Sequence, residues 1–193
     1  MNDYKQPDFY RFNSDSLFLV QWILKKRIRG NRILDLGAGC GVIGIELAIQ
    51  LRPSLLTSLE VQKDFLSYLK TNSEYYIPSL KHNIYSEAFS DWKPDTSYDL
   101  IASNPPYYLP DSGQPSSDIR RGIARTFSID GWAPFLKCIE QSLSIEGKAF
   151  IVIKNEKKTI ALIRQLVVQT GLKLIEEVTS DLMVLELMRL YID

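Results

Sequence analysis

The glycine-rich segment Asp35–Gly41 most constrains what this chain can fold into. It reads D-L-G-A-G-C-G, and it lies between a short apolar strand predicted over Arg32–Leu36 and an apolar helix predicted over Val42–Leu51. Glycines in such a turn let the backbone change direction sharply and let a ligand approach the main chain closely. A strand, a glycine turn and a helix in this order are typical of the units that build a parallel β-sheet.

The rest of the chain alternates short β-branched runs with longer helical stripes. Further strands are predicted over residues 54–59, 81–85, 98–103, 148–153, 172–178 and 182–190, and helices over 14–28, 63–75, 131–143 and 156–170. We expect the last two strands to pair antiparallel because a short connection joins them. The sequence therefore predicts an α/β fold: a three-layer α/β/α sandwich on a mostly parallel seven-stranded sheet with an antiparallel last strand.

Composition limits the class of protein. The 193 residues fit one domain, in which residues 1–30 form a helical lead-in and residues 31–193 the main body. Two cysteines and one histidine are too few for a structural zinc site, so we expect no metal. No stretch approaches the roughly 20 apolar residues of a membrane span, and the N-terminal residues lack the apolar run of a signal peptide. We therefore expect a cytoplasmic monomer without membrane contact.

The glycine turn has the features of a ligand site. A dinucleotide-binding turn would place a third glycine where Val42 stands, and no Lys-Ser/Thr pair follows as in a phosphate loop. Glu60 ends the next predicted strand, and its carboxylate can accept hydrogen bonds from both hydroxyls of a ribose. The alternative is a turn that only joins two elements, with Glu60 a solvated strand end. Expected ligand contacts are Asp35, Gly37, Gly39, Gly41 and Glu60.

A second motif directly follows the strand predicted over residues 98–103. It consists of Asn104, Pro105, Pro106 and Tyr107. Prolines lack the backbone donor, so the carbonyls here and the Asn104 side chain can accept both hydrogens of an –NH2 group. Tyr107 offers a flat face on which a planar base or amide can stack. The alternative is an ordinary Pro-Pro turn. The motif follows the carboxyl end of a strand, at the same end of the sheet as the glycine turn, and this placement argues against that alternative.

Together the two motifs resemble those of class I S-adenosylmethionine-dependent methyltransferases with an N-P-P-Y motif. Within that Rossmann-like group the chain is most similar to bacterial enzymes that methylate N6 of adenosine 37 in valine tRNA. The closer resemblance lies in three segments, Tyr10–Leu17, Glu60–Gln62 and Gly122–Arg125. It implies S-adenosylmethionine as cofactor, residues 104–107 as the catalytic motif, a lead-in that places Asp15 near the methionine end of the cofactor, and Glu87 as a substitute for the acid that typically meets the cofactor adenine.

The expected substrate is RNA, most of all tRNA. The polar segment that follows the N-P-P-Y motif contains the candidate substrate contacts Tyr108, Arg120, Arg121 and Arg125. Two alternatives stay open: a protein-glutamine N5-methyltransferase, and a non-catalytic fold that binds cofactor or RNA. Protein-glutamine enzymes usually carry a larger N-terminal helical domain than the roughly 30 residues that precede the first strand here.

Overall fold

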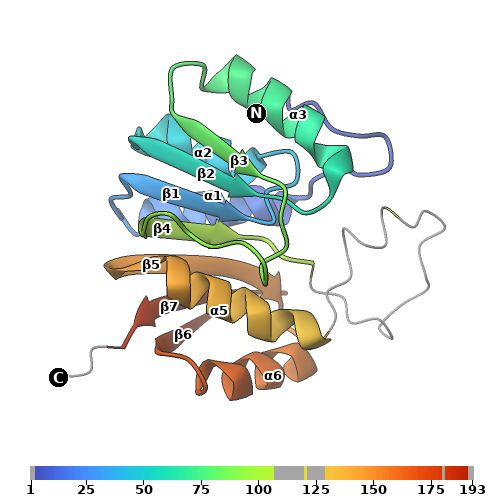
Figure 1. Ribbon diagram of the computed structural model, residues 1–193. Coiled ribbons are helices and arrows are strands. Elements are labelled where there is room, and N and C mark those ends of the chain that lie inside the picture. The colour runs from blue at the N-terminus through green and yellow to red at the C-terminus, as the bar shows by residue number, and fades with distance from the viewer. Residues whose placement is uncertain (1–2, 107–119, 121–128, 180, 191–193) are drawn as a thin grey trace.

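The computed structural model describes residues 3–106, 120, 129–179 and 181–190 (Figure 1). The α-helices are α1 (Ser14–Lys25), α2 (Val42–Leu51), α3 (Lys63–Tyr76), α5 (Trp132–Ser142) and α6 (Lys157–Val167), with a short 3₁₀ helix at Ile129–Gly131. The strands are β1 (Arg32–Leu36), β2 (Leu55–Leu59), β3 (His82–Tyr85), β4 (Tyr98–Ser103), β5 (Leu143–Lys154), β6 (Leu172–Thr179) and β7 (Leu182–Arg189).

The seven described strands form one sheet in the order β3-β2-β1-β4-β5-β7-β6. The first five strands in this order run parallel, and β7 pairs antiparallel with both β5 and β6. The order reverses at β1, so the carboxyl ends of β1 and β4 lie side by side, where open α/β sheets bind ligands. The predicted α/β sandwich with its antiparallel strand is confirmed.

Helices cover both faces of the sheet (Figure 1). Alternate residues of β1 show how the strands divide the core between the faces. Ile33 packs in the cluster that includes α1 and α2, whereas Leu34 and Leu36 pack in the cluster that includes α5 and α6. Buried on both faces, the central strands are almost continuously apolar, as their sequences predict.

Helix α1 packs on the same face of the sheet as α2 and extends toward the edge formed by β7 and β6. Its apolar residues Leu19 and Ile23 belong to the same buried cluster as Phe150 of β5 and Val184 of β7. At its C-terminal end, Lys26 forms an ion pair with Glu177 of β6. The helix ends at Lys25, three residues before the predicted end, because Arg27 adopts a left-handed φ of 52° that no regular helix contains.

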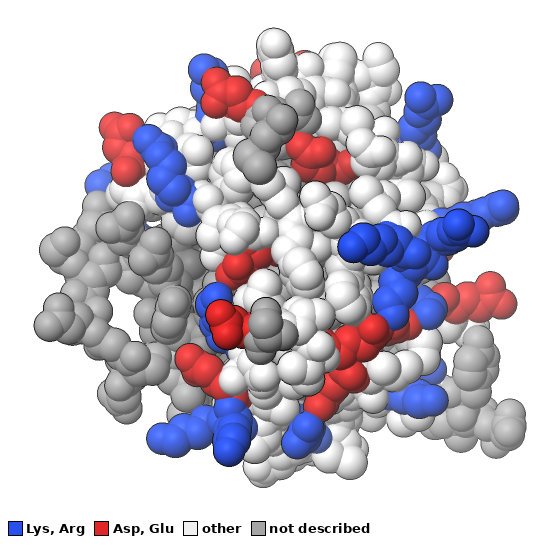
Figure 2. Space-filling model, turned by 180° about the vertical axis from the view of Figure 1, so that it is seen from behind, with Lys and Arg blue, Asp and Glu red and all other residues white. Residues whose placement is uncertain are grey.

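Exposed cations lie at the end of α1 and just after it, at Lys25, Lys26, Arg27 and Arg29. On the face shown in Figure 2, basic side chains gather along the right side of the view, with acidic side chains beside them. The four cations at the end of α1 precede β1, so they lie toward the amino ends of the central parallel strands. The glycine turn lies at the opposite, carboxyl ends of these strands.

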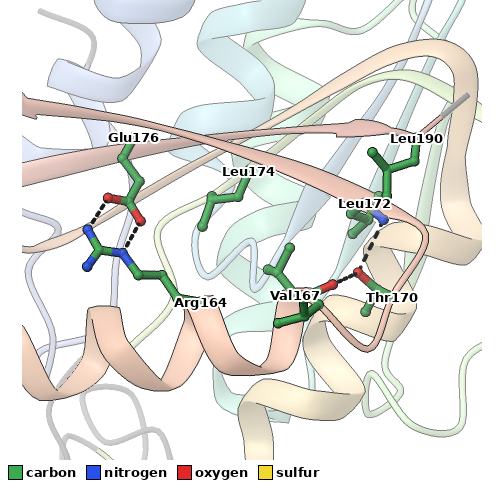
Figure 3. A pocket seen from close by; sticks show the side chains of 8 residues that line it. Arg164, Val167, Thr170, Leu172, Leu174, Glu176 and Leu190 are labelled. Carbon is green, nitrogen blue, oxygen red and sulfur yellow. Dashed lines mark hydrogen bonds and ion pairs between the residues drawn. The ribbon is translucent and has the colours of Figure 1, made fainter.

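A hollow of about 360 Å³ lies between α6 and edge strand β6 (Figure 3). Its floor is apolar, with Val167, Leu172 and Leu174 among the lining residues. The Arg164 guanidinium donates two hydrogen bonds to the Glu176 carboxylate across one end, at 2.8 and 2.6 Å. This edge of the sheet is the one opposite β3, and no residue of the candidate site described below lines the hollow.

Helix α6 ends at Val167, earlier than predicted. Gly171 does not close this helix in a left-handed conformation, because it is not among the described residues with positive φ. Its backbone N–H instead donates to Glu140 Oε1 at 2.7 Å.

Within the described ranges, no helix combines the length and apolar character needed to cross a membrane.

Candidate cofactor and substrate site

The glycine turn after β1 is held against the end of β2. The Gly37 and Ala38 N–H groups donate to the Leu59 carbonyl at 2.9 and 3.1 Å. Gly37 and Gly41 have φ values of 71° and 84°, in the left-handed region that side chains disfavour. A Cβ on Gly41 would also lie 2.5 Å from Leu69 Cδ1. The glycines are therefore required both by the backbone path and by the close approach of α3.

Asp35, buried behind the glycine turn, bonds the first turn of α2. Its side chain is 1% exposed, and Oδ2 accepts a hydrogen bond of 2.9 Å from the N–H of Gly44. Helix α2 has no side-chain cap at its first residue, so this carboxylate satisfies one of the unpaired N–H groups of its first turn. Burial raises the pKa of Asp35 to about 7, with the Gly44 hydrogen bond lowering it and the charge of Glu60 raising it.

Gly44 was not singled out by the sequence pattern. A Cβ at this position would lie 2.8 Å from Asp35 Oδ2 and 3.1 Å from Leu56 Cδ1. Its glycine lets α2 pack close to β1 and lets Asp35 reach the helix backbone. The signal was present as a glycine inside an otherwise apolar helix, which usually has a packing reason.

Glu60 follows β2 and faces the glycine turn. Its Oε2 accepts from the Gly39 N–H and its Oε1 from the Gln62 N–H, both at 2.7 Å. The side chain is 6% exposed, and burial raises its pKa while these backbone hydrogen bonds lower it. Each carboxylate oxygen has a second lone pair. The two bonds therefore fix the orientation of Glu60 and leave acceptor capacity for a ligand.

The space in front of the turn suits a ligand that approaches the backbone. Among the described residues, a Cβ on Gly39 would meet no atom within 4 Å. A Cβ on Gly37 would meet only Phe89 Cζ, at 3.9 Å. Phe89 belongs to the loop after β3 and packs on Phe135 at 5.2 Å between ring centroids.

The loop after β3 thus brings an aromatic ring to the turn, and sequence reasoning missed it. The sequence pattern indicated the acid Glu87 in this loop instead, and the Glu87 side chain is exposed. An aromatic residue two positions after an acid carries no signal by itself, because most such residues belong to a core.

Asn104 lies beside the glycine turn. The preceding residue, Ser103, donates its hydroxyl to the Leu36 carbonyl at 2.6 Å, which ties the end of β4 to the residue before Gly37. The Asn104 amide Nδ2 donates to Ser16 Oγ at 3.0 Å and to Asn13 Oδ1 at 3.4 Å. Its Oδ1 is buried without a hydrogen-bond partner in the part of the chain that is described. Pro105 is buried next to it.

Asp15 lies in the same corner of the site. It is 6% exposed and accepts a hydrogen bond of 2.8 Å from Asn13 Nδ2. Lys154, at the end of β5, forms an ion pair with its Oδ2 at 3.8 Å. The lead-in helix therefore meets the carboxyl ends of β4 and β5, and it places Asp15 in the same corner as Asn104.

Arg120 reaches this side of the molecule from the segment after β4. Its backbone carbonyl accepts from Gln62 Nε2 at 3.2 Å, and its guanidinium lies 4.4 Å from the centre of the Phe9 ring and 4.0 Å from Asp64. Four other predicted site residues, Tyr107, Tyr108, Arg121 and Arg125, lie outside the described residues.

The described residues hold no cluster of three or more histidine, cysteine, aspartate or glutamate side chains suited to a metal ion. Cys40 lies within the glycine turn, where burial and the charge of Glu60 raise the pKa of its thiol to about 12. A thiol with so high a pKa stays protonated at neutral pH and is a poor nucleophile.

The fold has clear structural relatives. A methyltransferase from Pyrococcus furiosus superposes with a TM-score of 0.72 at 17% identity, over 98% of this chain and 89% of that one. A T. thermophilus 16S rRNA methyltransferase solved with AdoMet and guanosine gives a TM-score of 0.66 at 19% identity, over 94% of this chain and 44% of that one. This chain therefore shares the Rossmann-like fold of these two structures.

Sequence comparison gives the family. Residues 10–177 match the methyltransferase small domain, and the chain belongs to that family. One relative is a tRNA1(Val) (adenine(37)-N6)-methyltransferase of Pedobacter heparinus, 29% identical over 143 residues that cover 74% of this chain and 59% of the relative. The chain spans about three-fifths of the length of the first curated relatives that it matches.

Proposed function

We propose that this protein transfers a methyl group from S-adenosylmethionine to N6 of an adenosine in RNA, with tRNA as the substrate class. The observation that carries the proposal is the Asn104 side-chain oxygen, which is buried and unpartnered among the described residues at the sheet edge that carries the glycine turn. A buried acceptor without a partner is rare in proteins. An amine donor from a substrate would satisfy it.

The site residues suit the cofactor. The open space at Gly39 and the oriented carboxylate of Glu60 would receive the methionine part and the ribose of S-adenosylmethionine, and Phe89 offers an apolar ring beside Gly37. Asp35 stays beneath the turn, where it holds α2 in place. When bound, S-adenosylmethionine supplies an electrophilic methyl group on its sulfonium.

The chemistry of the target amine explains the acceptor. The lone pair of an exocyclic amine is delocalised into the base, so the nitrogen is a weak nucleophile. An acceptor on its N–H bonds favours a pyramidal nitrogen and stabilises the positive charge that develops there during transfer. Asn104 Oδ1 supplies one such acceptor, and backbone carbonyls next to Pro105 and Pro106 supply others. No general base is needed, because the amine can lose its proton after the transfer.

Two observations support RNA as the substrate. The curated relatives are named for N6 of an adenine in tRNA. Arg120 also lies at the catalytic side of the sheet, near Gln62 and Asp64 at the start of α3. An adenosine must leave its base stack to present N6 to an enclosed acceptor, and cations next to the site can hold the flanking phosphates.

The proposal is tested by mass spectrometry of nucleosides. We expect tRNA from a strain that lacks the gene to lose N6-methyladenosine, and the purified protein with S-adenosylmethionine to restore it to that tRNA. If the tRNA nucleosides are unchanged while a protein gains methyl groups on glutamine, the enzyme is a protein-glutamine methyltransferase. If neither substrate is methylated while cofactor or RNA binds, the fold is a binding module.

We predict that Glu60→Gln weakens cofactor affinity. The change removes the charge and one acceptor from the ribose site, and the loss of charge-assisted hydrogen bonds corresponds to about 1.5–3 kcal/mol, or roughly 10- to 150-fold in Kd. Isothermal calorimetry with S-adenosylmethionine measures it. Glu146→Gln, at an exposed carboxylate of β5 outside the candidate site, is the matched control and should leave the Kd unchanged. Equal affinity of Glu60→Gln and the parent would remove Glu60 from the cofactor site.

We predict that replacing Arg120 and Arg121 together by alanine flattens the salt dependence of tRNA binding. Each lost phosphate contact should lower the slope of log affinity against log salt by about 0.7 for a single-stranded region. The Asp64 contact of Arg120 is exposed and weak, so a phosphate can replace it. Lys25→Ala with Arg27→Ala is the control, with an expected parental slope. A parental slope for the Arg120 and Arg121 pair would exclude them as phosphate contacts.

A further inference from the structure

The side chain of Asn104 is oriented by the first turn of α1. Its amide nitrogen donates to the Ser16 hydroxyl at 3.0 Å and more distantly to Asn13 Oδ1 at 3.4 Å. Ser16 is 6% exposed and lies 88 residues before Asn104 in the chain. The contact therefore joins the lead-in helix to the catalytic motif across the carboxyl end of the sheet.

These contacts decide which end of the carboxamide is presented. An asparagine side chain has a donor end and an acceptor end of nearly the same shape, and a half-turn about its last torsion exchanges them. With Nδ2 held by Ser16, Oδ1 is the atom that remains without a partner in the described structure. A flipped carboxamide would present N–H to the N–H of the target amine, and two donors cannot bond each other.

A second set of contacts fixes Asn13 in turn. Asn13 Nδ2 donates to Asp15 Oδ2 at 2.8 Å, so its own oxygen is left to face Asn104. Asp15 is paired with Lys154 at the end of β5, at 3.8 Å. The Ser16 hydroxyl can donate as well as accept, so it is Asn13 Oδ1, an acceptor only, that makes Nδ2 the donor end of Asn104. Ser16 Oγ then accepts from that same end and holds it.

We propose that Ser16 is a positioning residue for methyl transfer: its hydroxyl accepts the Asn104 amide and so directs Asn104 Oδ1 toward the target amine. The inference rests on the proposed function, since it concerns the acceptor of that reaction. Ser16 touches neither substrate nor cofactor in this role and acts only through Asn104. Its loss should slow the transfer step and leave the binding of cofactor and RNA unchanged.

The test compares single-turnover rates of Ser16→Ala, Ser16→Thr and Ser79→Ala on tRNA from a strain that lacks the gene. One neutral hydrogen bond corresponds to roughly three- to tenfold in rate. We expect Ser16→Ala to lose that much at saturating substrate, with cofactor Kd, KM for tRNA and Tm close to parental values. Threonine keeps the hydroxyl and should restore the rate. Ser79 is exposed in the turn before β3, away from the candidate site, and its variant should match the parent.

A double-mutant cycle gives the sharper result. If Ser16 acts through Asn104, Ser16→Ala should cause no further loss in an Asn104→Ala background. An equal loss in both backgrounds, or a parental rate for Ser16→Ala, would show that Ser16 does not position Asn104. A parental rate for Asn104→Ala alone would show that Asn104 is not the acceptor, whereas no methyl transfer to tRNA by the parent would overturn the proposed function, so the two failures are distinguishable.

Discussion

Replacing Asn104 by alanine should reduce the rate of methyl transfer by about a hundredfold or more. The change removes an acceptor that acts on charge developing in the transition state, and loss of one such preoriented group costs about 10²–10³ in turnover. The cofactor contacts are made by the glycine turn and Glu60, so the Kd for S-adenosylmethionine should stay within about twofold of the parent. Single-turnover kinetics and calorimetry measure the two quantities separately.

Asn155→Ala is the matched control for this prediction. Asn155 follows β5 at the same edge of the sheet, and its side chain is exposed. Its truncation should leave the transfer rate unchanged. Near-normal turnover of Asn104→Ala would show that the reaction does not depend on this acceptor.

Replacing Asp35 by asparagine should stabilise the protein at alkaline pH. The pKa of Asp35 is raised to about 7 in the fold from a value of 3.8. Between these values the unfolded chain has released the proton while the folded protein retains it. The free energy of unfolding of the parent therefore falls as pH rises from about 4 to about 7. The gap corresponds to about 4 kcal/mol at pH 8. Asparagine keeps an acceptor for the Gly44 N–H and carries no charge.

Urea unfolding at several pH values checks this expectation. At pH 4 the two proteins should be similar, because Asp35 is then protonated, and the variant should gain in stability up to pH 8. Asp91→Asn, at an exposed carboxylate, should show no such trend relative to the parent. A difference between Asp35→Asn and the parent that stays constant from pH 4 to pH 8 would contradict the raised pKa.

The fold was largely predictable because its strands are buried and bounded by strong signals. Strands β1 and β4 have the predicted bounds, since each ends at a turn whose chemistry is visible in sequence: glycines after Leu36 and prolines after Asn104. Helix ends were less predictable. Arg27 ends the turn after α1 in a left-handed conformation that its residue type does not favour, so the sequence carries no local signal for it.

The candidate site was predicted in its backbone and missed in its supporting contacts. The glycines and Glu60 occur at fixed places relative to strands, so their neighbourhood follows from topology. Ser16, Gly44 and Phe89 come from a helix start, a helix interior and a loop, and no local pattern indicates where their side chains lie. Their importance arises from contacts between segments distant in sequence, which periodicity does not encode.

The docking of α1 has a consequence for the order in which the protein folds during its synthesis. Leu19 and Ile23 pack with Phe150 and Val184, and Lys26 pairs with a residue 151 positions later. A chain emerging from the ribosome therefore carries α1 long before the strands that cover it exist, and contacts of such high sequence separation form late. Because residues of α1 also bond Asn104, we expect the candidate site of a nascent chain to be completed only when the C-terminal hairpin has been synthesised and paired.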